Sequence, residues 1–96
     1  MIKILPEHLK IVKKILSETA PNCEARVFGS RVNGNPKDYS DLDIALASSE
    51  RLSLNTLGKI EEAFEESDIP FRVDILDWNA LSPEFQELIA KNCETL

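Results

Sequence analysis

Apolar residues recur at helical spacing in three segments of the chain, with polar residues at the positions between them. The first segment predicts a helix that begins at Pro6 and is stopped by Pro21. A second helix is expected over 54–66, and a third begins at Ser82-Pro83-Glu84 and runs nearly to Leu96. The positions predicted to face the core are Leu9, Val12, Ile15, Leu16, Leu57, Ile60, Phe64, Phe85, Leu88 and Ile89.

Strands are predicted where apolar residues alternate with polar ones, or form short runs between turn residues. In the second strand this alternation places the apolar residues on the core side and two acidic residues on the other side. The order helix, strand, strand, helix, strand, helix predicts a small α/β (α+β) fold, with a three-stranded mixed sheet packed with three to four helices. The predicted strands are 24–28, 41–46 and 71–76.

Composition excludes several classes of protein. The chain has 96 residues, which fits one domain over 1–96, and its 17 acidic and 11 basic side chains give a net charge of −6. Direct binding of nucleic acid is therefore not expected, because phosphate neutralisation needs clustered Lys and Arg. No segment resembles a signal peptide or a membrane span, so a cytoplasmic protein is expected. Cys23, Cys93 and His8 cannot build a zinc site, and both cysteines are expected to be reduced.

Two acidic residues, Asp41 and Asp43, are the sharpest local feature of the sequence. On a strand, residues two apart lie on the same face, about 6.6 Å from each other, so both carboxylates point the same way. Oxygen-rich sites of this kind suit Mg²⁺ together with substrate phosphates. The simpler alternative is a strand that emerges into solvent with two acidic residues.

The stretch before this strand carries features that suit a polyphosphate. Gly29 permits close approach of the backbone to a ligand, and Ser30 can cap a short helix and present its hydroxyl to an anion. Arg31 and Lys37 bracket the turn with positive charge. A P-loop is excluded, because Asn35-Pro36 stands where that motif needs lysine followed by serine or threonine.

A third acidic residue, Asp74, lies between apolar residues in the third predicted strand. A charged residue in that position is unusual unless it is paired or bound to a metal. Arg72 lies two residues away on the same face and is a candidate ion-pair partner. The sequence alone leaves structural pairing and catalysis equally open for Asp74.

Together these residues resemble a known family. Gly29-Ser30, ten residues, and then Asp41-Leu42-Asp43 reproduces the Gly-Ser-x10-Asp-x-Asp signature of the DNA polymerase beta-type nucleotidyltransferase superfamily. The runs Phe28–Gly34 and Tyr39–Ile44 resemble those of its minimal nucleotidyltransferases, which are usually paired with HEPN-domain proteins as the antitoxins of toxin–antitoxin modules. Arg72-Val-Asp-Ile-Leu76 fits the place where that family has its third carboxylate. The resemblance implies the small nucleotidyltransferase fold over nearly the whole chain.

The resemblance also implies a role for each matched residue. Gly29 and Ser30 would hold the β- and γ-phosphates of ATP, and Arg31 would support them. Asp41 and Asp43 would bind two Mg²⁺ ions, and Asp74 would bind one of these and help deprotonate the attacking hydroxyl. The implied reaction transfers AMP to a tyrosine of the HEPN partner and thereby silences its ribonuclease activity.

Three functions remain open at this point. The leading hypothesis is a Mg²⁺-dependent nucleotidyltransferase that modifies its HEPN partner and acts as the antitoxin. The alternative is a catalytically silent protein of the same fold that neutralises its partner by complex formation. A transferase acting on a small molecule is the weakest hypothesis, because such enzymes normally need a second domain to bind the acceptor.

Overall fold

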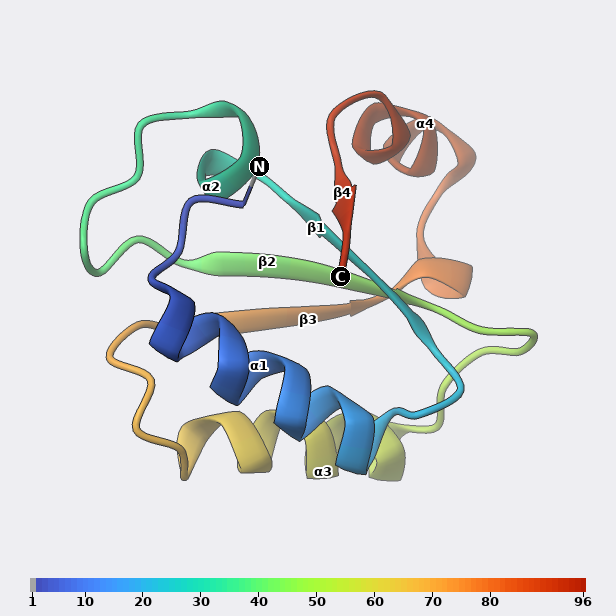
Figure 1. The fold of residues 1–96 in the computed structure, drawn as a ribbon. Coiled ribbons are helices and arrows are strands. Elements are labelled where there is room, and N and C mark those ends of the chain that lie inside the picture. The colour runs from blue at the N-terminus through green and yellow to red at the C-terminus, as the bar shows by residue number, and fades with distance from the viewer. Residues whose placement is uncertain (1) are drawn as a thin grey trace.

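Helices and strands follow one another in the predicted order in the computed structural model, which describes residues 2–96 (Figure 1). Within that range three further short elements appear, one each after the first strand, the third strand and the last helix. The elements are α1 Pro6–Thr19, β1 Glu24–Phe28, α2 Ser30–Asn33, β2 Leu42–Ala47, α3 Leu54–Glu65, β3 Val73–Asp77, the 3₁₀ helix η1 Trp78–Ala80, α4 Pro83–Lys91 and β4 Glu94–Thr95.

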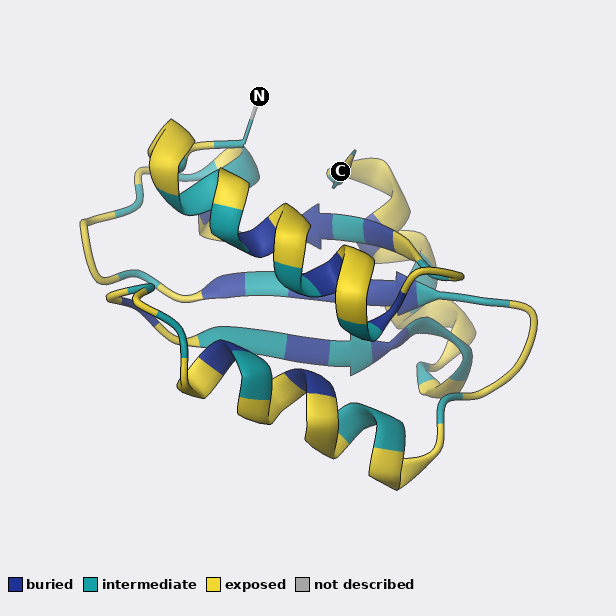
Figure 2. Cartoon of the chain, turned by 60° about the horizontal axis from the view of Figure 1, so that its bottom comes forward, coloured by how far each residue is buried: buried dark blue, intermediate teal, exposed yellow. Residues whose placement is uncertain are grey.

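The sheet has the strand order β3-β2-β1-β4. β1 pairs antiparallel with β2 and β4, whereas β2 and β3 are parallel, so the prediction of a mixed sheet is confirmed. The parallel pair is joined through α3, which is the crossover that parallel neighbours require. Helices α1 and α3 lie side by side on one face of the sheet, α4 lies on the other side, and the short helix α2 follows the end of β1 (Figures 1 and 2).

The core lies between the sheet and the pair α1 and α3. In β2, Leu42, Ile44 and Leu46 are all buried, as the alternation predicts. Val12 of α1 and Ile60 of α3 are fully buried against this face. Figure 2 shows buried positions on the sheet-facing sides of both helices and exposed positions on their outer sides.

The end of the chain differs from the prediction. The last helix ends at Lys91, with Asn92 as its C-cap, and does not run on toward Leu96. The chain then turns back, and β4 pairs with β1, so the sheet has four strands and not three. A strand of two residues has no alternation to detect, yet it covers the edge of β1 that would otherwise present unpaired backbone groups.

The apolar stripe predicted for the last helix is also only partly buried. Ile89 is buried, but Phe85 is partly exposed and Leu88 is 64% exposed. The ring of Phe85 meets that of Phe28 edge-on, with centroids 6.2 Å apart, so an aromatic contact joins α4 to the end of β1. Among the described residues, no helix combines the length and the apolar character needed to cross a membrane.

Replacement of a β2 core residue tests this assignment of the core. Leu46→Ala is expected to lower the free energy of unfolding by about 2–5 kcal/mol, because it leaves a cavity in a close-packed interior. Leu54→Ala is the matched control, since the same change is made at a side chain that is 88% exposed; it should stay within about 0.5 kcal/mol of the parent protein. Urea unfolding measures the stability of both variants, and equal losses of stability would contradict the assignment of the core.

Candidate functional site

Two carboxylates of the candidate site are brought together by the sheet. The parallel register pairs Asp43 of β2 with Asp74 of β3, and the antiparallel register pairs Asp43 with Phe28, the last residue of β1. Adjacent strands lie about 4.8 Å apart, so paired residues present their side chains to the same face. Asp41 is exposed and immediately precedes β2. Asp43, Asp74 and the Gly29-Ser30 turn therefore meet where β2 and β3 begin and β1 ends, and Asp41 is two residues before Asp43 in the chain.

Gly29 is a position that only glycine fits. Its φ of 82° lies in the left-handed region, and a Cβ built there would stand 2.4 Å from Oδ2 of Asp43. The backbone of the turn thus touches the carboxylate of β2 directly. Gly29 is also the N-cap of α2, so the prediction that Ser30 caps a short helix is wrong in detail. Ser30 is instead the first residue of that helix and is exposed.

Negative charge accumulates around Asp43. Burial raises the pKa of its carboxyl above the ordinary range, and the neighbouring carboxylates of Asp74 and Asp41 raise it further, while Arg72 acts in the opposite direction. Arg72 is the ion-pair partner of Asp74 that the sequence suggested, with 2.8 Å between Nη2 and Oδ1. The guanidinium offsets part of the repulsion, but the pKa of Asp43 remains raised.

The donor set fits a divalent cation by its chemistry. Carboxylate oxygens are the ligands that Mg²⁺ takes in proteins, and a cation between Asp41, Asp43 and Asp74 would relieve the repulsion that raises the pKa of Asp43. Over residues 2–96, no group of three or more His, Cys, Asp or Glu side chains is already arranged to hold a metal ion. One carboxylate of the set, that of Asp74, is bonded to Arg72.

Arg31 has a different set of contacts from the one expected of a phosphate-binding arginine. Its side chain is buried, and its guanidinium donates hydrogen bonds to main-chain carbonyls of Ser40, Lys3 and Asp38 at 2.9, 2.9 and 3.1 Å. The same group lies over the ring of Phe71, with Cζ 4.1 Å from the ring centroid. No local sequence pattern predicts these contacts, because their partners come from three separate segments of the chain.

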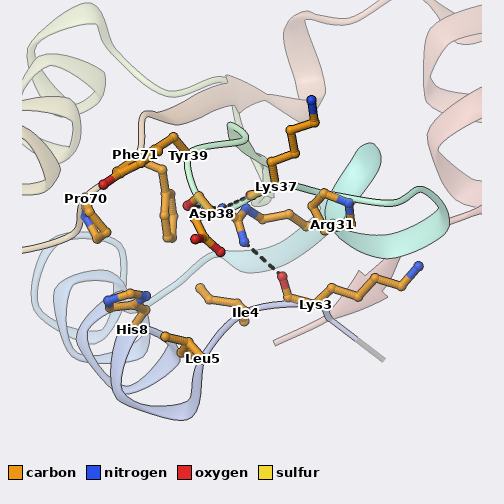
Figure 3. Close-up of a pocket in the computed structure, with 11 residues that line it drawn as sticks. Lys3, Ile4, Leu5, His8, Arg31, Lys37, Asp38, Tyr39, Pro70 and Phe71 are labelled. Carbon is orange, nitrogen blue, oxygen red and sulfur yellow. Dashed lines mark hydrogen bonds between the residues drawn. The ribbon is translucent and has the colours of Figure 1, made fainter.

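A cavity of about 530 Å³ opens beside this loop (Figure 3). Its wall includes the aromatic rings of His8, Tyr39 and Phe71, together with Arg31 and Lys37. His8 meets Phe71 edge-on, with ring centroids 5.7 Å apart. The lining contains none of the three carboxylates and neither residue of the Gly-Ser turn, so this cavity is adjacent to the candidate site and distinct from it.

The chain is similar to known nucleotidyltransferases. Residues 10–96 match the family described as polymerase beta, nucleotidyltransferase. The chain is 48% identical over 90 residues to a Haemophilus influenzae protein named probable protein adenylyltransferase MntA, covering 94% of this chain and 79% of that one.

Solved structures share the fold. A protein described as a minimal nucleotidyltransferase is 30% identical, with 94% of each chain covered and a TM-score of 0.73. A chain from a toxin–antitoxin structure with AMP-PNP superposes with a TM-score of 0.77 at 22% identity, over 95% of this chain and 72% of that chain.

Substitution of Gly29 tests the close approach to Asp43. Gly29→Ala is expected to lower the free energy of unfolding by about 1–3 kcal/mol, because the new Cβ meets Oδ2 of Asp43 and the backbone conformation is strained. Gly58→Ala is the control, since a Cβ at Gly58 in α3 meets nothing within 4 Å; it should raise stability by up to about 1 kcal/mol. Thermal or urea unfolding that ranks the two variants the other way round would refute this geometry.

The raised pKa of Asp43 predicts a dependence of stability on pH. In the unfolded chain this carboxyl ionises near pH 3.9, so the folded state retains its proton to higher pH than the unfolded state. Stability is therefore lost as the pH rises through this window. In metal-free buffer, Asp43→Asn should gain stability relative to the parent protein as the pH is raised from about 4 to 7. A difference that does not change with pH would contradict the raised pKa.

Proposed function

The chain belongs to the polymerase beta nucleotidyltransferase family, and on this basis we propose that it transfers AMP from ATP, with Mg²⁺, to a hydroxyl group of a HEPN-domain toxin and so acts as the antitoxin. The observation that carries the proposal is the register of the sheet, which sets Asp43 beside Asp74 and directly against the Gly29 turn. This is the placement that an enzyme needs if it binds phosphates and divalent cations at the same point.

Each site residue has a defined task in this reaction. Gly29 and Ser30 would hold the β- and γ-phosphates, and Asp41, Asp43 and Asp74 would hold two Mg²⁺ ions. Such ions stabilise the charge that develops on the attacking and leaving oxygens. Asp74 would accept the proton of the acceptor hydroxyl. The acceptor oxygen then bonds to the α-phosphorus, the bond from that phosphorus to the bridging oxygen breaks, and pyrophosphate leaves with the electron pair.

A protein acceptor is supported by the relatives of the chain. One relative is named as a protein adenylyltransferase, and one structural neighbour belongs to a toxin–antitoxin structure with AMP-PNP. The Arg-x4-6-His pattern of HEPN toxins is absent, because no arginine precedes the single histidine, His8. A cytoplasmic location, where ATP is available, is part of the proposal.

One observation favours the second candidate, a silent protein that neutralises its toxin by complex formation alone. Asp74 is held in an ion pair with Arg72, and the three carboxylates do not stand as a ready metal cluster in the described part of the chain. The two candidates differ in one result. A silent protein keeps its ability to neutralise the toxin when Asp41, Asp43 and Asp74 are all replaced by Asn.

The decisive experiment follows the label from ATP to the toxin. The chain is incubated with Mg²⁺ and with the HEPN-type protein encoded beside it. Label at the α-phosphorus should pass to that protein, whereas label at the γ-phosphorus should not, because the transferred group is AMP. Asp41→Asn and Asp43→Asn should each reduce the rate by more than about 100-fold, since each removes a metal ligand. Glu62→Gln on the exposed side of α3 is the control and should leave the rate unchanged.

Two outcomes would overturn the proposal. If the parent protein transfers no α-label, or if the Asp→Asn variants transfer it at the parent rate, the chain is not a nucleotidyltransferase of this kind. If the triple Asp→Asn variant also neutralises the toxin as well as the parent does, the second candidate replaces the first.

A further inference from the structure

Arg31 is the only buried residue in the described part of the chain that carries a full positive charge, being 5% exposed. Each of its three guanidinium nitrogens donates a hydrogen bond to a main-chain carbonyl: Nε to Ser40, Nη1 to Lys3 and Nη2 to Asp38. Nη2 also lies 3.4 Å from the carbonyl of Lys37, which is a weaker contact. The planar fork of an arginine is the side chain that can make all of these bonds at once.

These contacts join the separate pieces of the candidate site. Ser40 immediately precedes Asp41, and Phe71, whose ring lies under the guanidinium, comes three residues before Asp74. Arg31 itself directly follows Ser30 of the phosphate turn. One side chain therefore touches the segment leading into the first carboxylate and the segment leading into the third, and it is anchored beside the turn.

The loop that Arg31 holds has few other attachments. Within 37–40, the amide of Lys37 donates to Oγ of Ser40, and the amide of Ser40 donates back to the carbonyl of Lys37. These bonds close the turn on itself but do not fix it to the rest of the protein. On the other side, the amide of Lys3 donates to the carbonyl of Arg31 at 2.6 Å, so the segment before α1 is fastened to the same residue. Figure 3 shows the guanidinium lying between these two segments.

We infer that Arg31 is a positioning residue, which holds the loop leading into Asp41 against α2 and the start of β3 and does not contact the nucleotide. This replaces the expectation that Arg31 supports the phosphates, because its donors are already directed at carbonyls in a buried position. The inference rests on the proposed function for the role of the carboxylates, but the contacts themselves can be tested without the reaction.

Arg31→Lys is the test variant, because it keeps the charge and the stem but loses the fork. Two measurements need no turnover. Hydrogen exchange at the amides of Lys3, Ser40 and Leu42 reports how firmly the joined segments are held. Binding of Mn²⁺ without nucleotide, followed by electron paramagnetic resonance, reports the placement of the carboxylates, since Mn²⁺ accepts the same oxygen ligands as Mg²⁺. Exchange should speed up, and Mn²⁺ affinity should fall, each by about 10-fold.

Arg26→Lys is the matched control. Arg26 also lies over an aromatic ring, that of Trp78 at 4.4 Å, and pairs with Glu24, but it has no contact with the loop. Both measurements should stay within about twofold of the parent protein. Phe71→Leu provides a second variant if Arg31→Lys fails to fold, because it removes only the ring beneath the guanidinium. It should shift exchange and Mn²⁺ affinity in the same direction by a smaller factor, and an unchanged loop in Phe71→Leu would count against the inference.

Arg31→Met separates positioning from charge. Removing a positive charge near Asp41 would by itself tighten the binding of Mn²⁺, since Coulomb repulsion is lost. Loss of positioning predicts the opposite, weaker binding by about 10-fold. Tighter binding of Mn²⁺ by Arg31→Met would overturn the inference. So would Arg31→Lys if its hydrogen exchange is unchanged and only its KM for ATP rises, since that result indicates a direct phosphate contact. If the parent protein transfers no AMP while Arg31→Lys loosens the loop and weakens Mn²⁺ binding, the proposed reaction fails and the positioning role stands.

Discussion

β2 contributes buried apolar residues on one face and a carboxylate of the candidate site on the other, and the rest of the structure depends on this alternation. It lies between β1 and β3 and is hydrogen-bonded on both sides. Leu42, Ile44 and Leu46 are buried under the two helices, while Asp43 on the other face meets the Gly29 turn and Asp74. Because side chains alternate along a strand, the register that buries the core also sets the carboxylate. A slip of one residue would bury Asp43 and expose the leucines.

The second constraint is electrostatic. Three carboxylates gather at one edge of the sheet, and the pKa of Asp43 is raised because burial and its two acidic neighbours disfavour its charge. Two arginines lie nearby with different functions. Arg72 pairs directly with Asp74 and is exposed, whereas Arg31 is buried and bonded to carbonyls. Burial lowers the pKa of Arg31, and the negative charges of Asp38 and Asp41 offset this only in part. The protein itself thus offsets the repulsion among the carboxylates only in part, and a bound divalent cation would neutralise the remaining negative charge.

Much of the fold follows from the spacing of apolar residues, since long periodic segments are the clearest sequence signal. The helices beginning at Pro6 and near Leu54 end within two residues of their predicted limits, and the mixed sheet is confirmed. The end of the chain was not predictable in the same way. β4 is a pair of residues whose structure comes from pairing with β1, a contact between segments about 70 residues apart in the sequence. The limited burial of Leu88 likewise depends on how few elements cover α4.

The contacts of the candidate site also differ in how far the sequence predicts them. The ion pair of Asp74 with Arg72 could be anticipated from strand alternation. The pairing of Asp43 with Asp74 and the contact of Gly29 with Asp43 could not, because alternation within a strand does not fix the order of the strands in the sheet. The contacts of Arg31 could not, because adjacency to Ser30 in the sequence says nothing about the direction in which a long side chain extends. Its partners are carbonyls, which every residue has, so no residue type marks them.

This difference has a physical consequence for the site. Asp43 and Asp74 are placed by neighbouring strands whose ladder fixes their separation, so the position of one carboxylate relative to the other is set by the fold itself. Asp41 and Ser30 lie outside that ladder, on the segments before β2 and after β1. Their position relative to the strands needs a separate tie, and Arg31 is the described side chain that spans from α2 to Ser40 and to Phe71. The site therefore combines a half held by the hydrogen bonds between β2 and β3 with a half in which the buried guanidinium of Arg31 adds contacts that the ladder does not supply.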